Sequence, residues 1–334
     1  MKRANSPIIG LAAALCVALC GCASSGQGSA GSLVLKAGFS TEASDPRVAA
    51  TELFAREVEE ATEGRITVEI HTDGELGSDS ELISGVVNGE VDITVSSAGN
   101  FSAYSANVGI SAFPFLFDNF DDAWAFVDGE IEARAESELP DYNIKVLGHF
   151  DNGFRCVTTS ETAGPVTGVE DLEGLVIRTP ENQIVMQTML FLGATPRVLG
   201  FAQLRDALER GEFDAQENPI PVIYNNHLYE VQKFLAITNH SYDVMLFVLR
   251  DDIWKKLSEE DREILQTAAK HAQDLDRELI RSQTESYLQE LEKTGMVITY
   301  PDLKEFQKKT APIYESFRDS YDPELLSMVM GGAR

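Results

Sequence analysis

Basic residues, cysteines and recognisable catalytic motifs are all scarce in this chain of 334 residues. It has 27 lysine and arginine residues against 54 aspartate and glutamate residues. A body this acidic repels polyanions, which argues against nucleic acid as a partner. It also repels anionic lipid headgroups, so contact with a membrane has to come from some other feature.

Cysteine is limited to four positions, and Cys16, Cys20 and Cys22 all lie in the first 22 residues. Cys156 is then the only cysteine left for a folded body, which excludes a disulfide framework within it. Neither the cysteines nor the five scattered histidines show zinc-site spacing, and no nucleophile or phosphate-loop motif is present. We therefore expect no metal, no cofactor and no covalent chemistry, and we interpret Cys156 as a small buried apolar residue.

The first 22 residues have the pattern of an export signal. Lys2 and Arg3 precede an apolar run at 8–19 that is too short to span a bilayer. The sequence then reads Leu19-Cys20-Gly21-Cys22, which resembles a bacterial lipoprotein lipobox, although cysteine is unusual at position 20. The resemblance implies a signal peptide at 1–21, lipidation of Cys22 and a flexible tether at 22–32. The alternative is an ordinary signal peptide with a chance cysteine.

Strand-like and helix-like segments alternate along the rest of the chain. The pattern predicts strands at 33–39, 66–70, 91–97, 154–159, 175–178, 213–218 and 244–249. It predicts helices at 46–64, 181–192 and 202–210, and one that follows a turn at 73–74 and is closed by Asn88-Gly89. This order is typical of a largely parallel α/β sheet, in which ligands bind beyond the carboxyl ends of the strands. A further helix from about Ser258 to Thr294 would be on the order of 50 Å long, enough to cross two lobes.

Arg178 ends an apolar strand in a chain with few cations to spare. Its guanidinium is always charged and matches a carboxylate at two points. Two interpretations stay open at this stage: Arg178 grips a small anion, or it forms a structural ion pair with one of the many carboxylates.

Several segments together resemble one known family. They are Gly38, Glu75-Leu76-Gly77, Asn88-Gly89-Glu90-Val91-Asp92, Phe113-Pro114-Phe115-Leu116, Asn152-Gly153-Phe154-Arg155, the run 171–178, Gly193-Ala194-Thr195-Pro196, the run 214–219, and the runs 229–234 and 238–240. In order and spacing they resemble the extracytoplasmic solute receptors of TRAP transporters, the DctP family, and the last runs are similar to the sialic-acid-binding members.

The resemblance implies a two-lobed α/β fold of the periplasmic-binding-protein type (type II-like), with a long lobe-spanning helix. Lobe I would comprise residues 33–153 plus about 244–280, and lobe II residues 154–243 plus about 295–334. Residues 258–294 would form the connecting helix. The cleft between the lobes would close on a small organic acid, which a separate TRAP membrane permease then receives.

The family's site residues carry over by position. Arg178 matches the arginine that forms a two-point salt bridge with the ligand carboxylate, and Arg155 matches a second arginine that often contacts the same anion. The alternative for Arg155 is that it supports Arg178 without contacting the ligand itself. Asn218 matches an asparagine that also holds the carboxylate, and Phe201 an aromatic residue that packs on the ligand. Glu217 is expected to orient an arginine, because it would repel an anionic ligand.

Ser40, Asp79, Ser97 and Asn100 fall where the first lobe would read the far end of the ligand. For Ser40, Ser97 and Asn100, ordinary loop or capping roles remain an alternative. Ser97 stands in place of a glutamate and Ser40 in place of an asparagine of the sialic-acid-binding members, and Arg205 takes a slot that is usually tyrosine. These departures argue against sialic acid and leave the far end of the ligand open.

The expected protein is thus an exported receptor, lipid-anchored to the outer face of the cell membrane or in the periplasm. Its expected ligand is a sugar acid, a hydroxy or keto acid, or a dicarboxylate, and its membrane contact is the lipid anchor alone. Two alternatives remain: a ligand-sensing module for a signalling partner, and an exported hydrolase or lyase. The missing nucleophile–base pair argues against the enzyme.

Overall fold

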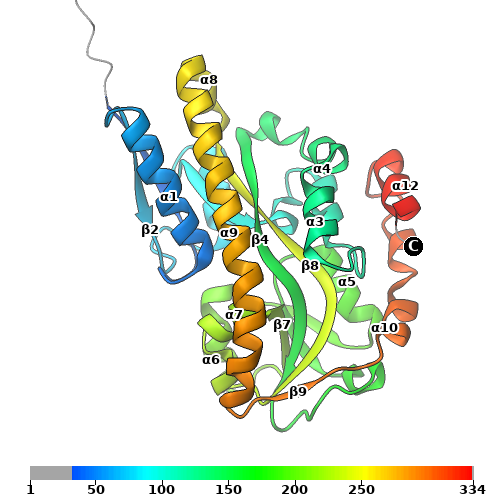
Figure 1. Ribbon diagram of the computed structural model, residues 1–334. Coiled ribbons are helices and arrows are strands. Elements are labelled where there is room, and N and C mark those ends of the chain that lie inside the picture. The colour runs from blue at the N-terminus through cyan, green and yellow to red at the C-terminus, as the bar shows by residue number, and fades with distance from the viewer. Residues whose placement is uncertain (1–31, 333–334) are drawn as a thin grey trace, which may run out of the picture. The chain divides into compact units, whose positions relative to one another are not determined.

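The computed structural model describes residues 32–332 as a nine-stranded mixed sheet with helices packed around it (Figure 1). The strands in sheet order are β2 (Ile66–His71), β1 (Leu33–Gly38), β3 (Ile93–Ser97), β8 (Phe234–Arg250), β4 (Ile144–Thr159), β7 (Ala215–Pro219), β5 (Val176–Thr179) and β6 (Thr195–Val198), and β9 (Val297–Thr299) pairs with β8. The expected signal peptide, the Cys22 lipidation site and nearly all of the tether lie outside the described residues.

Long and short helices connect these strands. The α-helices are α1 (Pro46–Ala61), α2 (Asp79–Asn88), α3 (Phe120–Val127), α4 (Glu130–Ala135), α5 (Gln183–Phe191), α6 (Leu204–Glu209), α7 (Ile220–Asn225), α8 (Asp251–Lys256), α9 (Glu259–Lys293), α10 (Leu303–Thr310), α11 (Ile313–Ser316) and α12 (Pro323–Gly332). The 3₁₀ turns are η1 (Ala98–Phe101), η2 (Ala106–Ala112), η3 (Leu139–Tyr142), η4 (Val169–Leu172), η5 (Phe201–Gln203) and η6 (Leu228–Glu230). The predicted helix at 202–210 is in fact the η5 turn followed by the shorter α6.

The two ends of the sheet are each parallel. β1 pairs in parallel with β2 and β3, and β5 pairs in parallel with β6 and β7. Between them run β4 and β8, which pair antiparallel with each other and with their outer neighbours β7 and β3. We call β1–β3 with their helices the first half and β5–β7 with their helices the second half. Both halves are built on the same two long strands.

β4 and β8 are much longer than the six-residue strands predicted at 154–159 and 244–249. They span 16 and 17 residues, and their pairing contains three register shifts, between Val146 and Gly148, Asp151 and Gly153, and Arg155 and Val157. Each shift breaks the alternation of buried and exposed positions, so a period-two pattern cannot be followed through it. The prediction of two short strands was therefore wrong in length.

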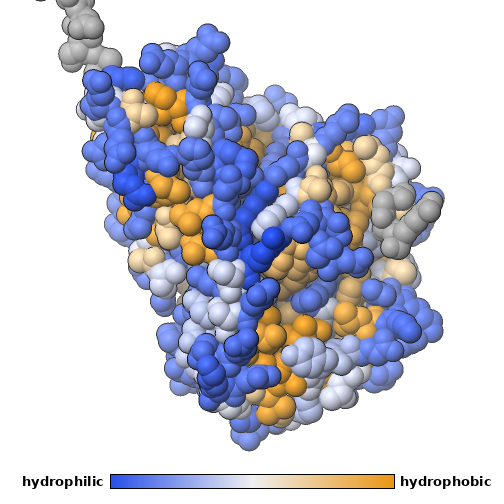
Figure 2. Space-filling view, viewed as in Figure 1, coloured by the Kyte–Doolittle hydropathy of each residue, from blue (hydrophilic) through white to orange (hydrophobic). Residues whose placement is uncertain are grey.

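α9 is the predicted long helix, and it starts where the sequence placed it. The Ser258 hydroxyl accepts a hydrogen bond from the Asp261 amide at 3.0 Å and so caps the first turn. The helix packs along α1, β4 and α7, which places it across elements of both halves (Figure 1). Its outer face is polar, and the band of hydrophilic residues down the middle of Figure 2 follows it.

The hydrophobic core is divided into several clusters on the two faces of the sheet. Leu265 near the start of α9 packs with residues of α1, β1 and β8, whereas Leu291 near its end packs with α6, α7 and β8. The C-terminal segment also contacts both halves, because Phe306 of α10 packs beside α5 and Leu325 of α12 lies in a cluster with residues of α4 and η2. Within residues 32–332 no helix is both long and apolar enough to cross a membrane.

Candidate functional site

A small cavity of about 40 Å³ lies where the carboxyl ends of β1, β3, β5 and β7 approach one another. Its lining includes all eight residues that the sequence predicted as ligand contacts: Ser40, Asp79, Ser97, Asn100, Arg155, Arg178, Phe201 and Asn218. The sequence reasoning missed six others, which are Thr41, Arg47, Asn152, Pro180, Val222 and Met245. The position at the carboxyl ends of parallel strands agrees with the general rule for ligand sites in α/β sheets.

Arg178 is the residue of this cavity whose charge is least compensated. It lies in β5, is 3% exposed, and donates from Nε and Nη2 to the carbonyl of Leu199 at 2.9 and 2.6 Å. Its guanidinium carbon is 6.0 Å from the ring centre of Phe201. No carboxylate of residues 32–332 is within ion-pair distance, and Nη1 makes no hydrogen bond to them. Burial lowers the pKa of Arg178 to about 10, so the side chain is still charged at neutral pH.

A comparison with the other buried arginines of residues 32–332 shows that the lack of a carboxylate partner is unusual. Arg47, Arg155, Arg178 and Arg277 are the buried arginines among the described residues. The first pairs with Asp45, the second with Glu217 and Asp243, and the fourth with Asp128. Of these four, only Arg178 has no carboxylate partner within residues 32–332. A buried charge without a partner is costly, so this position is suited to an anion from outside the chain.

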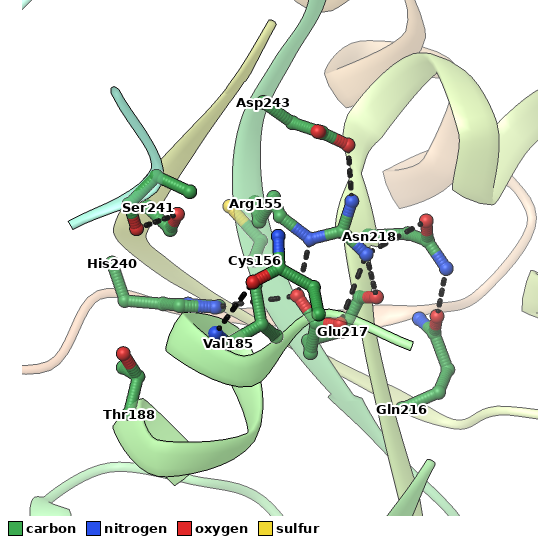
Figure 3. A network of polar contacts seen from close by, with 12 residues as sticks. Arg155, Cys156, Val185, Thr188, Gln216, Glu217, Asn218, His240, Ser241 and Asp243 are labelled. Carbon is green, nitrogen blue, oxygen red and sulfur yellow. Dashed lines mark hydrogen bonds and ion pairs between the residues drawn. The ribbon is translucent and has the colours of Figure 1, made fainter. Parts of the chain in front are cut away.

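Arg155 in β4 is compensated from several sides (Figure 3). Nε and Nη2 donate to the Glu217 carboxylate, Nη1 donates to Asp243, and Nη2 also lies 3.2 Å from the amide oxygen of Asn218. Burial opposes the charge of Arg155, but the charges of Glu217 and Asp243 outweigh it and raise its pKa. Arg155 therefore reaches the cavity wall as part of a neutralised network, which favours the supporting role among the two that the sequence left open.

Glu217 holds Arg155, as the sequence led us to expect. Burial acts against its charge, yet Arg155 keeps the pKa of Glu217 below its ordinary value. Behind it lies His240, whose Nε2 is 3.4 Å from the carboxylate and whose pKa is lowered by burial. Asn218 donates to the Gln216 side chain at 2.6 Å while its oxygen faces Arg155. These contacts fix the orientation of Asn218 at the cavity.

The first half contributes mostly hydroxyls and one carboxylate. Oδ1 of Asp79, the first residue of α2, accepts hydrogen bonds from the hydroxyls of Ser40 at 2.8 Å and Ser96 at 3.2 Å. Ser97 donates to Asp243 at 3.2 Å and so faces the floor of the cavity. The amide oxygen of Asn100 is buried without a hydrogen-bond partner in the described chain. An acceptor left in this state is suited to a ligand hydroxyl.

Arg47 and Asn152 continue the polar floor from one half to the other. Asp45 caps α1 by accepting from the Arg47 amide, and it also accepts from Nε of Arg47 at 2.8 Å. Arg47 Nη2 lies 3.4 Å from the Asn152 oxygen, and Asn152 donates to Asp243 at 2.8 Å. Asp243 in turn accepts from Arg155. Arg47 is the second residue of α1 and so lies close to the loop that follows the carboxyl end of β1. This position in the sequence could have identified it as a candidate site residue.

Two contacts join the halves beside the cavity. The Ser80 hydroxyl of α2 donates to Glu181, which precedes α5, at 3.0 Å. Gly99 of η1 packs against Asn182, and a Cβ atom at Gly99 would lie 1.9 Å from the Asn182 amide nitrogen. Asn182 cannot easily retreat, because its oxygen accepts from the first backbone amides of α5. The close approach of the halves thus depends on a glycine at 99.

Other candidate residues lie apart from the cavity. Arg205 does not line it: its side chain pairs with Glu230 at 2.5 Å on the surface, so it supplies no second cation there. Cys156 is buried, and burial raises the pKa of its thiol to about 11, which agrees with an inert apolar residue. Within residues 32–332 no group of three or more histidine, cysteine or acidic side chains could hold a metal ion.

A cavity between two parallel α/β halves, joined by two long strands and a long helix, defines a two-lobed solute-binding protein. The comparisons with known proteins give the family. Residues 37–320 match the DctP family, described as "Bacterial extracellular solute-binding protein, family 7". The chain belongs to this family, the extracytoplasmic solute-binding proteins of TRAP transporters.

Two curated relatives and two solved structures illustrate the similarity. The chain is 32% identical over 273 residues to the 2,3-diketo-L-gulonate-binding periplasmic protein of Escherichia coli, covering 81% of this chain and 83% of the relative. It is 26% identical over 294 residues to the sialic acid-binding periplasmic protein of Vibrio cholerae, covering 88% and 91%. These relatives are receptors rather than enzymes.

Among solved structures, the sugar acid binding protein of Advenella mimigardefordensis in complex with galactonate superposes with a TM-score of 0.86 at 27% identity, covering 91% of this chain and 98% of that one. A TRAP periplasmic solute binding protein of Polaromonas bound to D-erythronate gives 0.85 at 30% identity, covering 89% and 98%. The fold predicted from the sequence is therefore confirmed.

Proposed function

We propose that this protein binds a small organic acid in the cavity between its halves and delivers it to a TRAP membrane permease. The observation that carries the proposal is Arg178, a buried cation that no carboxylate of the described chain compensates. A ligand carboxylate supplies the missing charge and accepts from Nη1, with Asn218 beside it. Arg155 holds Asn218 and the floor of the site in place and contributes little net charge.

A sugar acid is the ligand class that the surroundings favour. The wall opposite Arg178 offers hydroxyls, amides and one carboxylate acceptor, all of which pair with ligand hydroxyls. Galactonate, D-erythronate and 2,3-diketo-L-gulonate, the acids named for three relatives, are hydroxylated carboxylic acids. We infer the same class here, and sialic acid is disfavoured because Ser97 and Ser40 replace the residues typical of its receptors.

Binding requires the two halves to separate. The cavity has room for only a few water molecules, at about 10–15 Å³ each by the same measure. A six-carbon acid therefore enters an opened form, and the halves then close over it with β4, β8 and α9 as the connection. In this proposal the halves are the two lobes predicted from the sequence. The ligand favours closure because its carboxylate contacts one lobe and its hydroxyls the other.

A thermal-shift screen tests the proposal most broadly. Ligand that binds only the native state stabilises it by about 2.7 kcal/mol at 100 times Kd. We expect Tm to rise with one or more hydroxylated carboxylic acids and to stay unchanged with their neutral parent sugars. A rise with neutral sugars alone, or with no organic acid in a broad panel, overturns the proposal.

We further propose that the protein is held at the outer face of the membrane by a lipid on Cys22. The support is the lipobox-like sequence Leu19-Cys20-Gly21-Cys22 and a body too acidic to adhere to anionic lipid. Metabolic labelling with a fatty-acid analogue should mark the wild type and not the Cys22→Ser variant, which should leave the membrane fraction. If the label persists in the variant, either Cys20 carries the lipid or the lipobox interpretation is wrong.

A further inference from the structure

Arg47 brings a third guanidinium, beside those of Arg155 and Arg178, to the cavity from the half opposite Arg178. It is 7% exposed, lines the cavity, and is held by Asp45 through Nε and by Asn152 through Nη2. Its Nη1 makes no hydrogen bond to any residue of the described chain. The family resemblance assigned no role to this side chain, and its charge is already compensated by Asp45. Arg47 can therefore donate a hydrogen bond without demanding a further negative charge.

Asp79 is the matching acceptor on the same wall. Its Oδ1 accepts from Ser40 and Ser96, whereas its Oδ2 accepts from no residue of 32–332. No basic side chain of those residues lies within ion-pair distance, although the charge of Asp79 acts on both Arg47 and Arg178. A carboxylate that faces the cavity in this way accepts hydrogen bonds from hydroxyl groups and repels other anions.

The charges around the cavity limit what the far end of a ligand can be. Three guanidiniums and four carboxylates lie in or directly beside the cavity lining. The guanidiniums belong to Arg47, Arg155 and Arg178, and the carboxylates to Asp45, Asp79, Glu217 and Asp243. One ligand carboxylate is held by Arg178 directly. A second one at the far end would meet Asp79 and add to an excess of negative charge in a buried site.

We propose that Arg47 and Asp79 together recognise adjacent hydroxyl groups at the end of the ligand away from its carboxylate. This proposal rests on the proposed function above and narrows the ligand to polyhydroxy monocarboxylic acids. A hydroxyl is both donor and acceptor, so one hydroxyl accepts from Arg47 Nη1 while it or its neighbour donates to Asp79. A second carboxylate accepts only, and a methyl group does neither, so both leave Oδ2 of Asp79 without a hydrogen bond.

Three four-carbon probes with the same 2-hydroxy acid head test this directly. They are 2,3,4-trihydroxybutanoate, 2-hydroxybutanoate, which lacks the two far hydroxyls, and malate, which has a carboxylate there. We expect calorimetric titration of the wild type to show at least about tenfold tighter binding of the trihydroxy acid than of the other two. Tighter binding of malate overturns the proposal.

Variants then assign the effect to the two residues. Asp79→Asn, which keeps the shape of the side chain, and Arg47→Met should each weaken binding of the trihydroxy acid at least about tenfold. They should change binding of 2-hydroxybutanoate less than about threefold, and Arg47→Lys should recover part of the loss. Equal losses for both probes in both variants mean that these residues act on the fold, which contradicts the proposal.

Failure of the proposed function is distinguishable from failure of this inference. If the wild type binds none of the three acids and no six-carbon sugar acid, carboxylate binding itself is wrong and the diol proposal falls with it. If the acids bind and Arg178→Met abolishes their binding, but the probes do not differ in affinity, only the diol proposal is wrong. Should Arg47→Met fail to fold, the Asp79→Asn comparison still decides the question.

Discussion

The surroundings of Arg155 and Arg178 differ more than their positions do. The two side chains lie on β4 and β5, separated in the sheet only by β7, and each is 3% exposed. Arg155 is enclosed by Glu217 and Asp243, whereas Arg178 has a backbone carbonyl and an aromatic ring. The same residue type thus has two different surroundings at one cavity. Arg155 has its counter-charges within the chain, whereas in the proposed function a ligand supplies the counter-charge of Arg178.

A buried carboxyl group can become neutral near physiological pH, whereas a buried arginine stays charged. Asp151, 2% exposed, has no ion pair within the described residues, and burial raises its pKa to about 6. A carboxyl group can therefore lose its charge near neutral pH. Arg178, with its pKa lowered only to about 10, cannot. The comparison predicts that an unpaired buried acid makes the stability of the protein depend on pH, whereas an unpaired buried arginine makes the protein bind an anion.

Removing Arg155 should have the largest effect, and it should be on stability. Arg155→Met leaves the buried carboxylates of Glu217 and Asp243 without their arginine, and breaking a buried ion pair from one side typically costs about 3–5 kcal/mol. Urea unfolding should show this loss, while the matched Arg178→Met variant should change stability by less than about 1 kcal/mol. If the two variants are equally stable, the two environments are not different in the way described.

Removing Arg178 should affect binding instead. Truncating one side of a desolvated charge pair typically costs about 2–5 kcal/mol, which is roughly 30- to several-thousand-fold in affinity. Arg178→Met should lose this much affinity for a hydroxylated acid in calorimetry. Arg205→Met, which removes a surface arginine paired with Glu230, is the control and should bind as the wild type does. Affinity of Arg178→Met within a few-fold of wild type is the contrary result.

Asp151 extends the comparison to a carboxyl group. Its pKa is about 6 in the folded state and about 3.9 in an unfolded chain, so the folded state binds more protons between these values. Stability should accordingly fall as pH rises from about 4 to 6, by about 2–3 kcal/mol from this group, and then level off. Asp151→Asn should flatten that part of the profile. An unchanged difference between pH 4 and pH 7 in the variant contradicts the assignment.

Gly99→Ala should have the smallest effect of the four, and it should act on closure. The added methyl group meets Asn182 beside the cavity, and such overpacking typically costs about 1–3 kcal/mol. If the clash exists only when the halves are closed, affinity should fall about 5- to 150-fold while ligand-free stability changes less. Small-angle scattering at saturating ligand should show a more open average form than in the wild type. Undiminished affinity means that Gly99 tolerates a side chain in the bound form.

Much of the fold was readable from local pattern, and the failures have physical causes. α1 begins after Asp45 and α2 ends at Gly89, which is in a left-handed conformation, as the sequence indicated, whereas α1 ends at Ala61, before the predicted Gly64. The lengths of β4 and β8 were not readable because the register shifts interrupt the alternation that marks a strand. The segment between η1 and η3, which includes η2 and the short helices α3 and α4, carries no long periodic run and was not predicted.

The sequence predicted a set of residues that lie together around one cavity, but it did not predict their electrostatics. Family resemblance placed eight residues that do line one cavity, but it gave Arg155 and Arg178 similar roles. What separates them is Asp243, which lies on β8 and reaches Arg155 only through the pairing of distant strands. Arg47 was missed for the same reason, since its place in the cavity depends on how α1 packs. Residue type and spacing cannot report which charges are neutralised in the folded state.

One comparison tests the central claim most directly: the wild-type protein titrated with a hydroxylated acid and with its neutral analogue, in which the carboxylate is replaced by a hydroxymethyl group. The acid used should be the one that raises Tm most. Because Arg178 lacks any carboxylate partner in the described chain, we predict that the acid binds at least about 100-fold more tightly, a difference of about 2.8 kcal/mol. Equal or tighter binding of the neutral analogue would contradict the account.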